Sequence, residues 1–113
     1  MNPPEPSMRN RRLAKRRPPK RSTKITCRKG ALGLGPNLAL SLLDVSETGV
    51  RLVVKEDLKL RQEVEIGLLG IGHQRPIQIM GEVVWCVATA DGNHCLGIRF
   101  QRFLSYTDLQ HLT

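Results

Sequence analysis

The chain has 113 residues, 40% of them hydrophobic, which suffices for one modest core but not for two. Its formal net charge of +8 arises from the first 24 residues, which carry nine of the eighteen basic residues and one of the ten acidic residues. A neutral body with a cationic segment predicts an anionic partner. No apolar run approaches the roughly 18 residues of a membrane span, and no apolar segment follows the basic start as in a secretory signal.

Residues 1–22 combine proline, serine and asparagine with a dense run of like charge. Such a segment buries too little apolar surface to offset the entropy of ordering. We therefore expect a disordered basic arm over residues 1–22, followed by one folded domain over residues 23–113.

From residue 23 onward, short runs of alternating apolar and polar residues are separated by turn residues, which is typical of strands. Glu47-Thr48-Gly49 is a turn signal, so residues 38–54 are predicted to form a hairpin. Six short strands indicate an antiparallel barrel or sandwich. The predicted strands cover residues 25–30, 37–43, 50–55, 63–68, 77–88 and 96–101.

The 77–88 strand is the longest, and strict alternation divides its side chains between two faces. Its first face is predicted to hold Ile77, Ile79, Gly81, Val83, Trp85 and Val87. After the last strand, Ser105 is suited to cap a short helix with Asp108 in its first turn. We expect three leucines to pack that helix on the barrel: Leu104, Leu109 and Leu112.

Two short motifs carry the functional signal. Arg17 and Arg21 form an RxxxR preceded by Arg16, with Arg12 and Arg16 as an alternative frame for the pair. Residues 44–49 form a DxSxxG, which lies at the predicted hairpin turn. Their order and spacing are more specific than either motif alone, because RxxxR is common in basic segments.

Two further patterns follow in later strands: Gly81-Glu-Val-Val-Trp85 and Leu96-Gly97-Ile-Arg-Phe100. The combination resembles the PilZ domain family over roughly residues 16–112. The resemblance implies a six-stranded antiparallel β-barrel with a C-terminal helix. It also implies a receptor for cyclic di-GMP that has no catalytic activity.

The residue types of both motifs suit that ligand. Guanidinium groups meet the O6 and N7 acceptors of guanine bidentately, bind phosphate and stack on bases, which assigns Arg16, Arg17 and Arg21 to the ligand. Asp44 is an acceptor for the N1–H and N2–H donors of guanine. Ser46 is a donor for phosphate or for Asp44.

Two glycines complete the predicted site. Gly49 is expected to adopt a positive φ or to allow close approach of the ligand, and Gly97 to leave room for a purine. The arm is predicted to fold over the ligand and to present the newly ordered surface to a protein partner. Because ordering costs affinity, we expect binding in about the micromolar to submicromolar range.

Two other functions stay open at this point. The arm is also suited to clamp nucleic acid as a polycation, although a neutral body with few aromatics weighs against specific recognition of single strands. A PilZ-like domain without nucleotide binding would act as a protein adaptor. The sequence has no catalytic motif in a convincing context, so we expect no enzyme.

The three cysteines, Cys27, Cys86 and Cys95, are an odd number, which favours a reducing cytoplasm over a disulfide framework. They form no CxxC pair. His94 and Cys95 are neighbours in sequence and would point to opposite faces of a strand. We therefore predict no metal site and no cofactor.

Overall fold

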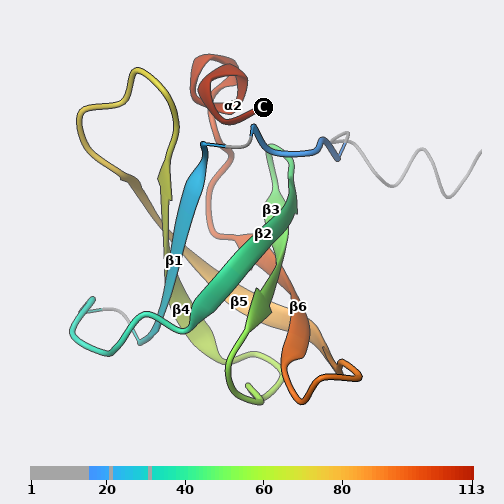
Figure 1. Ribbon diagram of the computed structural model, residues 1–113. Coiled ribbons are helices and arrows are strands. Elements are labelled where there is room, and N and C mark those ends of the chain that lie inside the picture. The colour runs from blue at the N-terminus through green and yellow to red at the C-terminus, as the bar shows by residue number, and fades with distance from the viewer. Residues whose placement is uncertain (1–15, 21, 31) are drawn as a thin grey trace, which may run out of the picture.

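The computed structural model describes residues 16–20, 22–30 and 32–113, which form a six-stranded antiparallel barrel and one short helix (Figure 1). The strand order is β1-β4-β5-β6-β3-β2. This architecture confirms the predicted fold class and selects the barrel over the sandwich. The elements are β1 (Lys24–Lys29), β2 (Ala39–Val45), β3 (Gly49–Val54), β4 (Glu63–Leu69), β5 (Ile77–Ala88), β6 (His94–Phe100) and α2 (Tyr106–Leu112).

β1 and β2 are the two ends of this strand order, and the segment that connects them brings them together. The backbone N–H of Leu38 donates to the carbonyl oxygen of Cys27 at 2.8 Å. The side-chain oxygen of Asn37 accepts from the N–H groups of Cys27 at 2.9 Å and Ala39 at 3.0 Å. These bonds satisfy backbone groups that an open sheet edge would expose.

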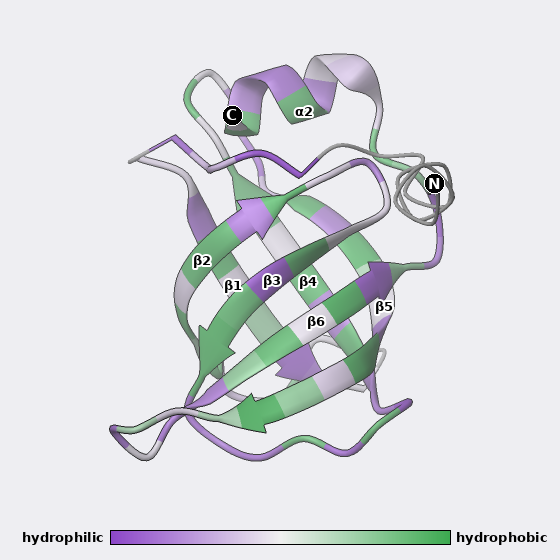
Figure 2. Ribbon diagram, turned by 90° about the vertical axis from the view of Figure 1, so that its right-hand side faces the viewer, coloured by the Kyte–Doolittle hydropathy of each residue, from purple (hydrophilic) through white to green (hydrophobic). Residues whose placement is uncertain are grey.

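The core is aliphatic and fills the barrel, as the alternation of apolar and polar positions along each strand in Figure 2 indicates. Alternation places every second side chain inside, as expected for a sheet with one buried face. The inward positions of β6 match the prediction, since Leu96, Ile98 and Phe100 are all buried. The largest fully buried side chains are Leu52, Ile66, Leu68, Leu96 and Leu112.

A register shift in β5 overturns part of the predicted face assignment. Val83 pairs with Ile98, but Trp85 pairs with Gly97 and Cys86 with Leu96, so Val84 is the extra residue of a β-bulge. Before the bulge, Val83 faces the core as predicted. After it, the inward position passes to Cys86, and Trp85 is on the outer face. The prediction that Trp85 and Val87 share the face of Ile79 was therefore wrong.

Helix α2 covers one end of the barrel, whereas the β3–β4 connection and the β5–β6 turn lie at the opposite end (Figure 1). Ser105 is its N-cap, and the Ser105 hydroxyl accepts from the N–H of Asp108 at 3.0 Å. The three predicted leucines, Leu104, Leu109 and Leu112, are buried. Both the cap and the packing of this helix are confirmed. Among the described residues, no helical segment has the length and apolarity needed to cross a bilayer.

Candidate functional site

The β2–β3 turn, which we call the corner (residues 44–49), is stabilised by its own side chains. The N–H of Ser46 donates to the carbonyl of Gly49 at 2.9 Å. The buried Ser46 hydroxyl accepts from the N–H of Thr48 at 3.2 Å and lies 3.2 Å from the Thr48 hydroxyl. Ser46 thus satisfies local donors, as serine does in tight turns. Contact with a ligand would be a second role.

Asp44 is at the end of β2 and has only 6% of its surface exposed. Nε of Arg51 donates to Oδ2 of Asp44 at 2.6 Å, and Nη1 of Arg16 donates to Oδ1 at 3.2 Å. The hydrogen bond to Asp44 raises the pKa of Arg51 above its ordinary value. Two guanidinium groups therefore neutralise one buried carboxylate, whereas the sequence predicted guanine or Ser46 as the donors to Asp44.

Arg17 joins the basic segment to the barrel. Its N–H donates to the carbonyl of Val45 at 2.9 Å, and the N–H of Val45 donates to the carbonyl of Arg17 at 3.0 Å. This isolated bridge brings the start of RxxxR against the start of DxSxxG. Nε of Arg17 is buried and has no hydrogen-bond partner among the residues that the structure describes. Such an orphaned donor costs about 1–3 kcal/mol, which an acceptor on a ligand would recover.

The rest of RxxxR is only partly described. Lys20 contacts the C-terminal end of helix α2, because its backbone N–H donates to the carbonyl of Leu112 at 2.8 Å. Arg21, and Arg12 of the alternative frame, lie outside the described residues. The predicted arm is likewise described only over residues 16–20 and 22, where it runs along the barrel rather than away from it.

The two predicted glycines have roles that differ from the expected ones. The φ of Gly49 is outside the left-handed region, and a Cβ there would overlap the carbonyl oxygen of Ile98. Gly49 is thus required by the close approach of β3 to β6. At Gly97, a Cβ would overlap the indole of Trp85, which occupies the space that the sequence suggested for a purine.

A surface cleft of about 240 Å³ lies beside the corner, and four of the predicted site residues line it: Arg16, Ser46, Gly49 and Gly97. Trp85 and Arg99 also contribute to its walls. Its volume is below the about 300–1,000 Å³ of most small-molecule sites. A dinucleotide would therefore need the Trp85 indole or the Arg16 side chain to move.

A larger cleft of about 350 Å³ adjoins it on the other side of Arg99 and is lined by Arg61, Glu63 and Glu82. Nη2 of Arg99 is 2.6 Å from Oε1 of Glu82. This cleft contains none of the predicted residues, and its two carboxylates offset the charges of Arg61 and Arg99, so it has no net positive charge to attract an anion. The smaller cleft, with its guanidinium groups and an indole, is the better candidate for an anionic aromatic ligand.

Comparison with protein families adds an independent finding: residues 10–113 match the family described as PilZ domain. The chain belongs to the PilZ family. The match spans both motifs and every strand, so it confirms the family that the sequence resembles. PilZ domains are non-catalytic receptors for cyclic di-GMP.

A search of the solved structures aligns this PilZ domain with the chain of "Structure of K. pneumonia MrkH-c-di-GMP complex". The TM-score is 0.60 with 18% sequence identity, and the alignment covers 89% of this chain and 48% of that chain. The chain therefore spans about half the length of that protein. At this identity, the likeness supports the barrel fold. The search of curated proteins finds no match.

Three residues of this PilZ domain were not predicted as site residues. Arg51 is the cross-strand partner of Asp44, because the observed pairing is centred between Glu47 and Thr48; a turn centred on Thr48, as the sequence predicted, would have placed Leu52 opposite Asp44. Trp85 reaches the cleft because the bulge turns the indole outward and pairs Trp85 with Gly97, and Arg99 lines the cleft from the outward face of β6. The local sequence has no signal for that bulge.

Proposed function

We propose that this PilZ domain binds cyclic di-GMP in the cleft beside the corner and signals through the rearrangement of its basic N-terminal segment. The single observation that carries the proposal is the backbone bridge between Arg17 and Val45. The bridge joins a cationic segment directly to the turn that carries the DxSxxG motif.

The site residues in this proposal are Arg16, Arg17, Arg21, Asp44, Ser46, Gly49 and Gly97. A ligand phosphate or the O6/N7 edge of guanine draws Arg16 away from Oδ1 of Asp44. Oδ1 then accepts from the N1–H and N2–H groups of guanine, while Arg51 keeps its bond to Oδ2. Asp44 exchanges one guanidinium for neutral guanine donors, but Arg51 keeps its ion pair with the carboxylate, so no charge is left buried without a partner.

The remaining residues complete the site. Arg17 contributes its Nε–H, which has no hydrogen-bond partner within residues 16–20, 22–30 and 32–113, and Arg21 binds the second phosphate or stacks on a base. Ser46 donates to a phosphate from within the turn. The Trp85 indole moves from its position over Gly97 and thereby widens the cleft.

The signal is the rearrangement of residues 1–22 over the ligand, starting from a state in which Arg17 and Lys20 already contact the barrel, and it creates a surface for a protein partner. The three cysteines are all free, which suits action in a reducing cytoplasm. Hydrogen exchange tests this step: ligand should slow exchange over residues 10–24. Equal exchange rates with and without bound ligand would overturn the ordering step while leaving ligand binding intact.

Isothermal calorimetry of the full chain with cyclic di-GMP tests the binding itself. We expect heat of binding with cyclic di-GMP, in about the micromolar to submicromolar range, and none with GTP or cyclic GMP. Arg17→Ala should abolish the heat, and Arg17→Lys should not restore it, because lysine cannot form the bidentate contact. Absence of heat from the unaltered chain would overturn the proposal.

A further inference from the structure

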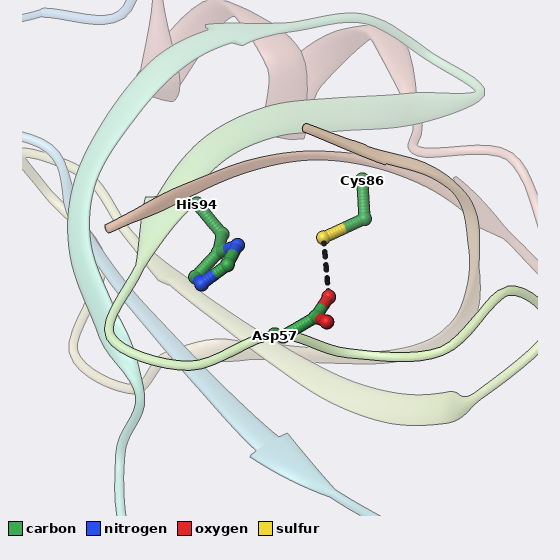
Figure 3. Close-up of side chains that lie close together, drawn as sticks. All are labelled: Asp57, Cys86 and His94. Atoms are coloured by element: carbon green, nitrogen blue, oxygen red, sulfur yellow. Dashed lines mark hydrogen bonds between the residues drawn. The ribbon is translucent and has the colours of Figure 1, made fainter. Parts of the chain in front are cut away.

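Three potential metal ligands converge at the barrel end opposite helix α2 and are drawn in Figure 3: Asp57, Cys86 and His94. One ligand atom from each residue lies within 4.8 Å of the other two. Sγ of Cys86 donates to Oδ1 of Asp57 at 3.3 Å. We call this group the thiol cluster, and it shares no residue with the proposed cyclic di-GMP site.

The bulge in β5 assembles this cluster. Because Val84 is inserted, Cys86 takes an inward position opposite Leu96 of β6. His94 begins β6 two residues before Leu96 and so lies on the same face of that strand. Asp57 comes from the β3–β4 connection, which passes this end of the barrel. In strict alternation Cys86 would instead point outward, and the cluster would not exist.

We propose that the thiol cluster binds one divalent zinc ion through Sγ of Cys86, a ring nitrogen of His94 and a carboxylate oxygen of Asp57, with water as the fourth ligand. Thiolate, imidazole and carboxylate are the three ligand types that zinc takes from proteins, and three protein ligands plus water make a common zinc site. The fourth position faces the outside, because the Asp57 side chain is exposed.

The geometry requires only a small contraction. Zinc–ligand bonds of about 2.0–2.3 Å in a tetrahedron put neighbouring ligand atoms about 3.5 Å apart. The pair Cys86–Asp57 already has a separation of 3.3 Å, and no pair exceeds 4.8 Å. The remaining pairs need to close by at most about 1.3 Å, which side-chain rotation of the exposed Asp57 and the half-buried His94 can supply.

Zinc binding requires the Cys86 thiol to lose its proton. Burial, followed by the hydrogen bond to Asp57 and its charge, raises the pKa of the Cys86 thiol, so the thiol holds its proton at neutral pH. Zinc replaces that proton: the S–H bond breaks, the proton leaves to solvent, and the sulfur lone pair forms the bond to the metal. The ion also relieves the repulsion between the carboxylate and the thiolate. No electron is transferred.

Cobalt(II) is the test probe, because it takes the same ligands as zinc and its bond to a thiolate gives a charge-transfer band in the near ultraviolet. The experiment uses the full chain, stripped of metal and kept reduced with a phosphine. We expect the band and the visible d–d bands to saturate at one cobalt per chain, and zinc to displace them. The melting temperature should rise with metal. A chain that gives no charge-transfer band overturns the proposal.

Variants assign the sulfur ligand. Cys86→Ala should abolish the band, whereas the matched control Cys95→Ala should keep it, since Cys95 is on the opposite face of β6. Removing Cys27 and Cys95 together leaves Cys86 as the only thiol of the chain. The band should survive in this double variant. It therefore assigns the sulfur ligand even where Cys86→Ala fails to fold. Loss of the band in this double variant, if it folds by circular dichroism, or in Cys95→Ala would contradict the assignment.

The other two ligands are tested by affinity. His94→Gln and Asp57→Asn should each weaken cobalt binding by about tenfold or more, since even outer-shell partners of metal ligands are worth about 10–100-fold. Cyclic di-GMP binding serves as the internal control and should be unchanged in these variants, because they lie at the far end of the barrel (Figure 1). Unchanged cobalt affinity in both variants would overturn the three-ligand site.

Discussion

Asp44 of β2 and Arg51 of β3 are cross-strand partners, and their ion pair forms the base of the corner. The carboxylate has 8% of its side-chain surface exposed, and the guanidinium has 43%. Arg51 therefore compensates a carboxylate that is almost removed from water, and this compensation makes the second carboxylate oxygen available to Arg16 or to a ligand.

Arg51→Ala should destabilise the fold by about 1–2 kcal/mol, less than the about 3–5 kcal/mol of a fully buried pair. The loss is smaller because Arg51 is partly exposed and Arg16 still contacts Asp44. Urea unfolding of both proteins measures the change in the free energy of unfolding. The control is Lys29→Ala, which removes an exposed pair with Glu56 and should cost at most about 0.5 kcal/mol. Equal losses in both variants would contradict the role of Arg51.

Alanine at Gly49 and at Gly97 should have separable effects. At Gly49 the new methyl group meets backbone of β6, which cannot turn away, so Gly49→Ala should cost about 3 kcal/mol or more. At Gly97 the atoms nearest to the new methyl group all belong to the Trp85 indole, a side chain that can shift, so Gly97→Ala should cost less, about 1–2 kcal/mol, and shift the tryptophan emission. Denaturant unfolding followed by fluorescence gives both results. Unshifted emission in folded Gly97→Ala would contradict the indole position.

Cys27 should make stability fall at high pH. Burial raises the pKa of this thiol from 9.0 to about 11, so between these values the unfolded chain loses the proton and the folded chain keeps it. The contribution is complete below pH 9 and is lost as pH rises toward 11, at about 1.4 kcal/mol per pH unit. Unfolding in urea at several pH values measures the slope. Cys27→Ala should have a flatter profile, and parallel profiles would contradict the burial of the thiol.

Salt should weaken ligand binding far less than it weakens binding to nucleic acid. Two phosphate charges predict that Kd rises by at most about twelvefold between 50 and 200 mM salt. A polyphosphate clamp with six to ten contacts would lose about 10³–10⁵ in affinity over the same range. Calorimetry with cyclic di-GMP and a filter-binding assay with single-stranded nucleic acid separate the two functions. Tight nucleic-acid binding that is steeply salt dependent would favour the basic segment as a nucleic-acid clamp.

The strands and the helix were predictable because their signals are local. Glu47-Thr48-Gly49 sets the hairpin, and Ser105 with Asp108 sets the start of α2. The bulge was not predictable, because residues 83–87 are Val-Val-Trp-Cys-Val, an unbroken apolar run in which a period of two cannot be detected. One inserted residue then reverses every following side chain.

The same limit applies to the site. The turn holds Asp44 and Ser46 close together, and the backbone bridge to Val45 brings Arg17 beside them. The position of Trp85 over Gly97 depends on the bulge and on the pairing of β5 with β6. Both strands are distant in sequence from the two motifs, so the motifs do not predict this contact. The constraint on Gly49 likewise comes from β6 rather than from its own turn.

The most direct test is an amide NMR titration of isotope-labelled protein with cyclic di-GMP. We predict that the largest shifts fall on the amides of Val45, Gly49 and Gly97 and on the indole N–H of Trp85, with smaller ones at the thiol cluster. Shifts centred on the Arg61–Glu82 cleft, or no shifts at saturating ligand, would contradict binding beside the corner.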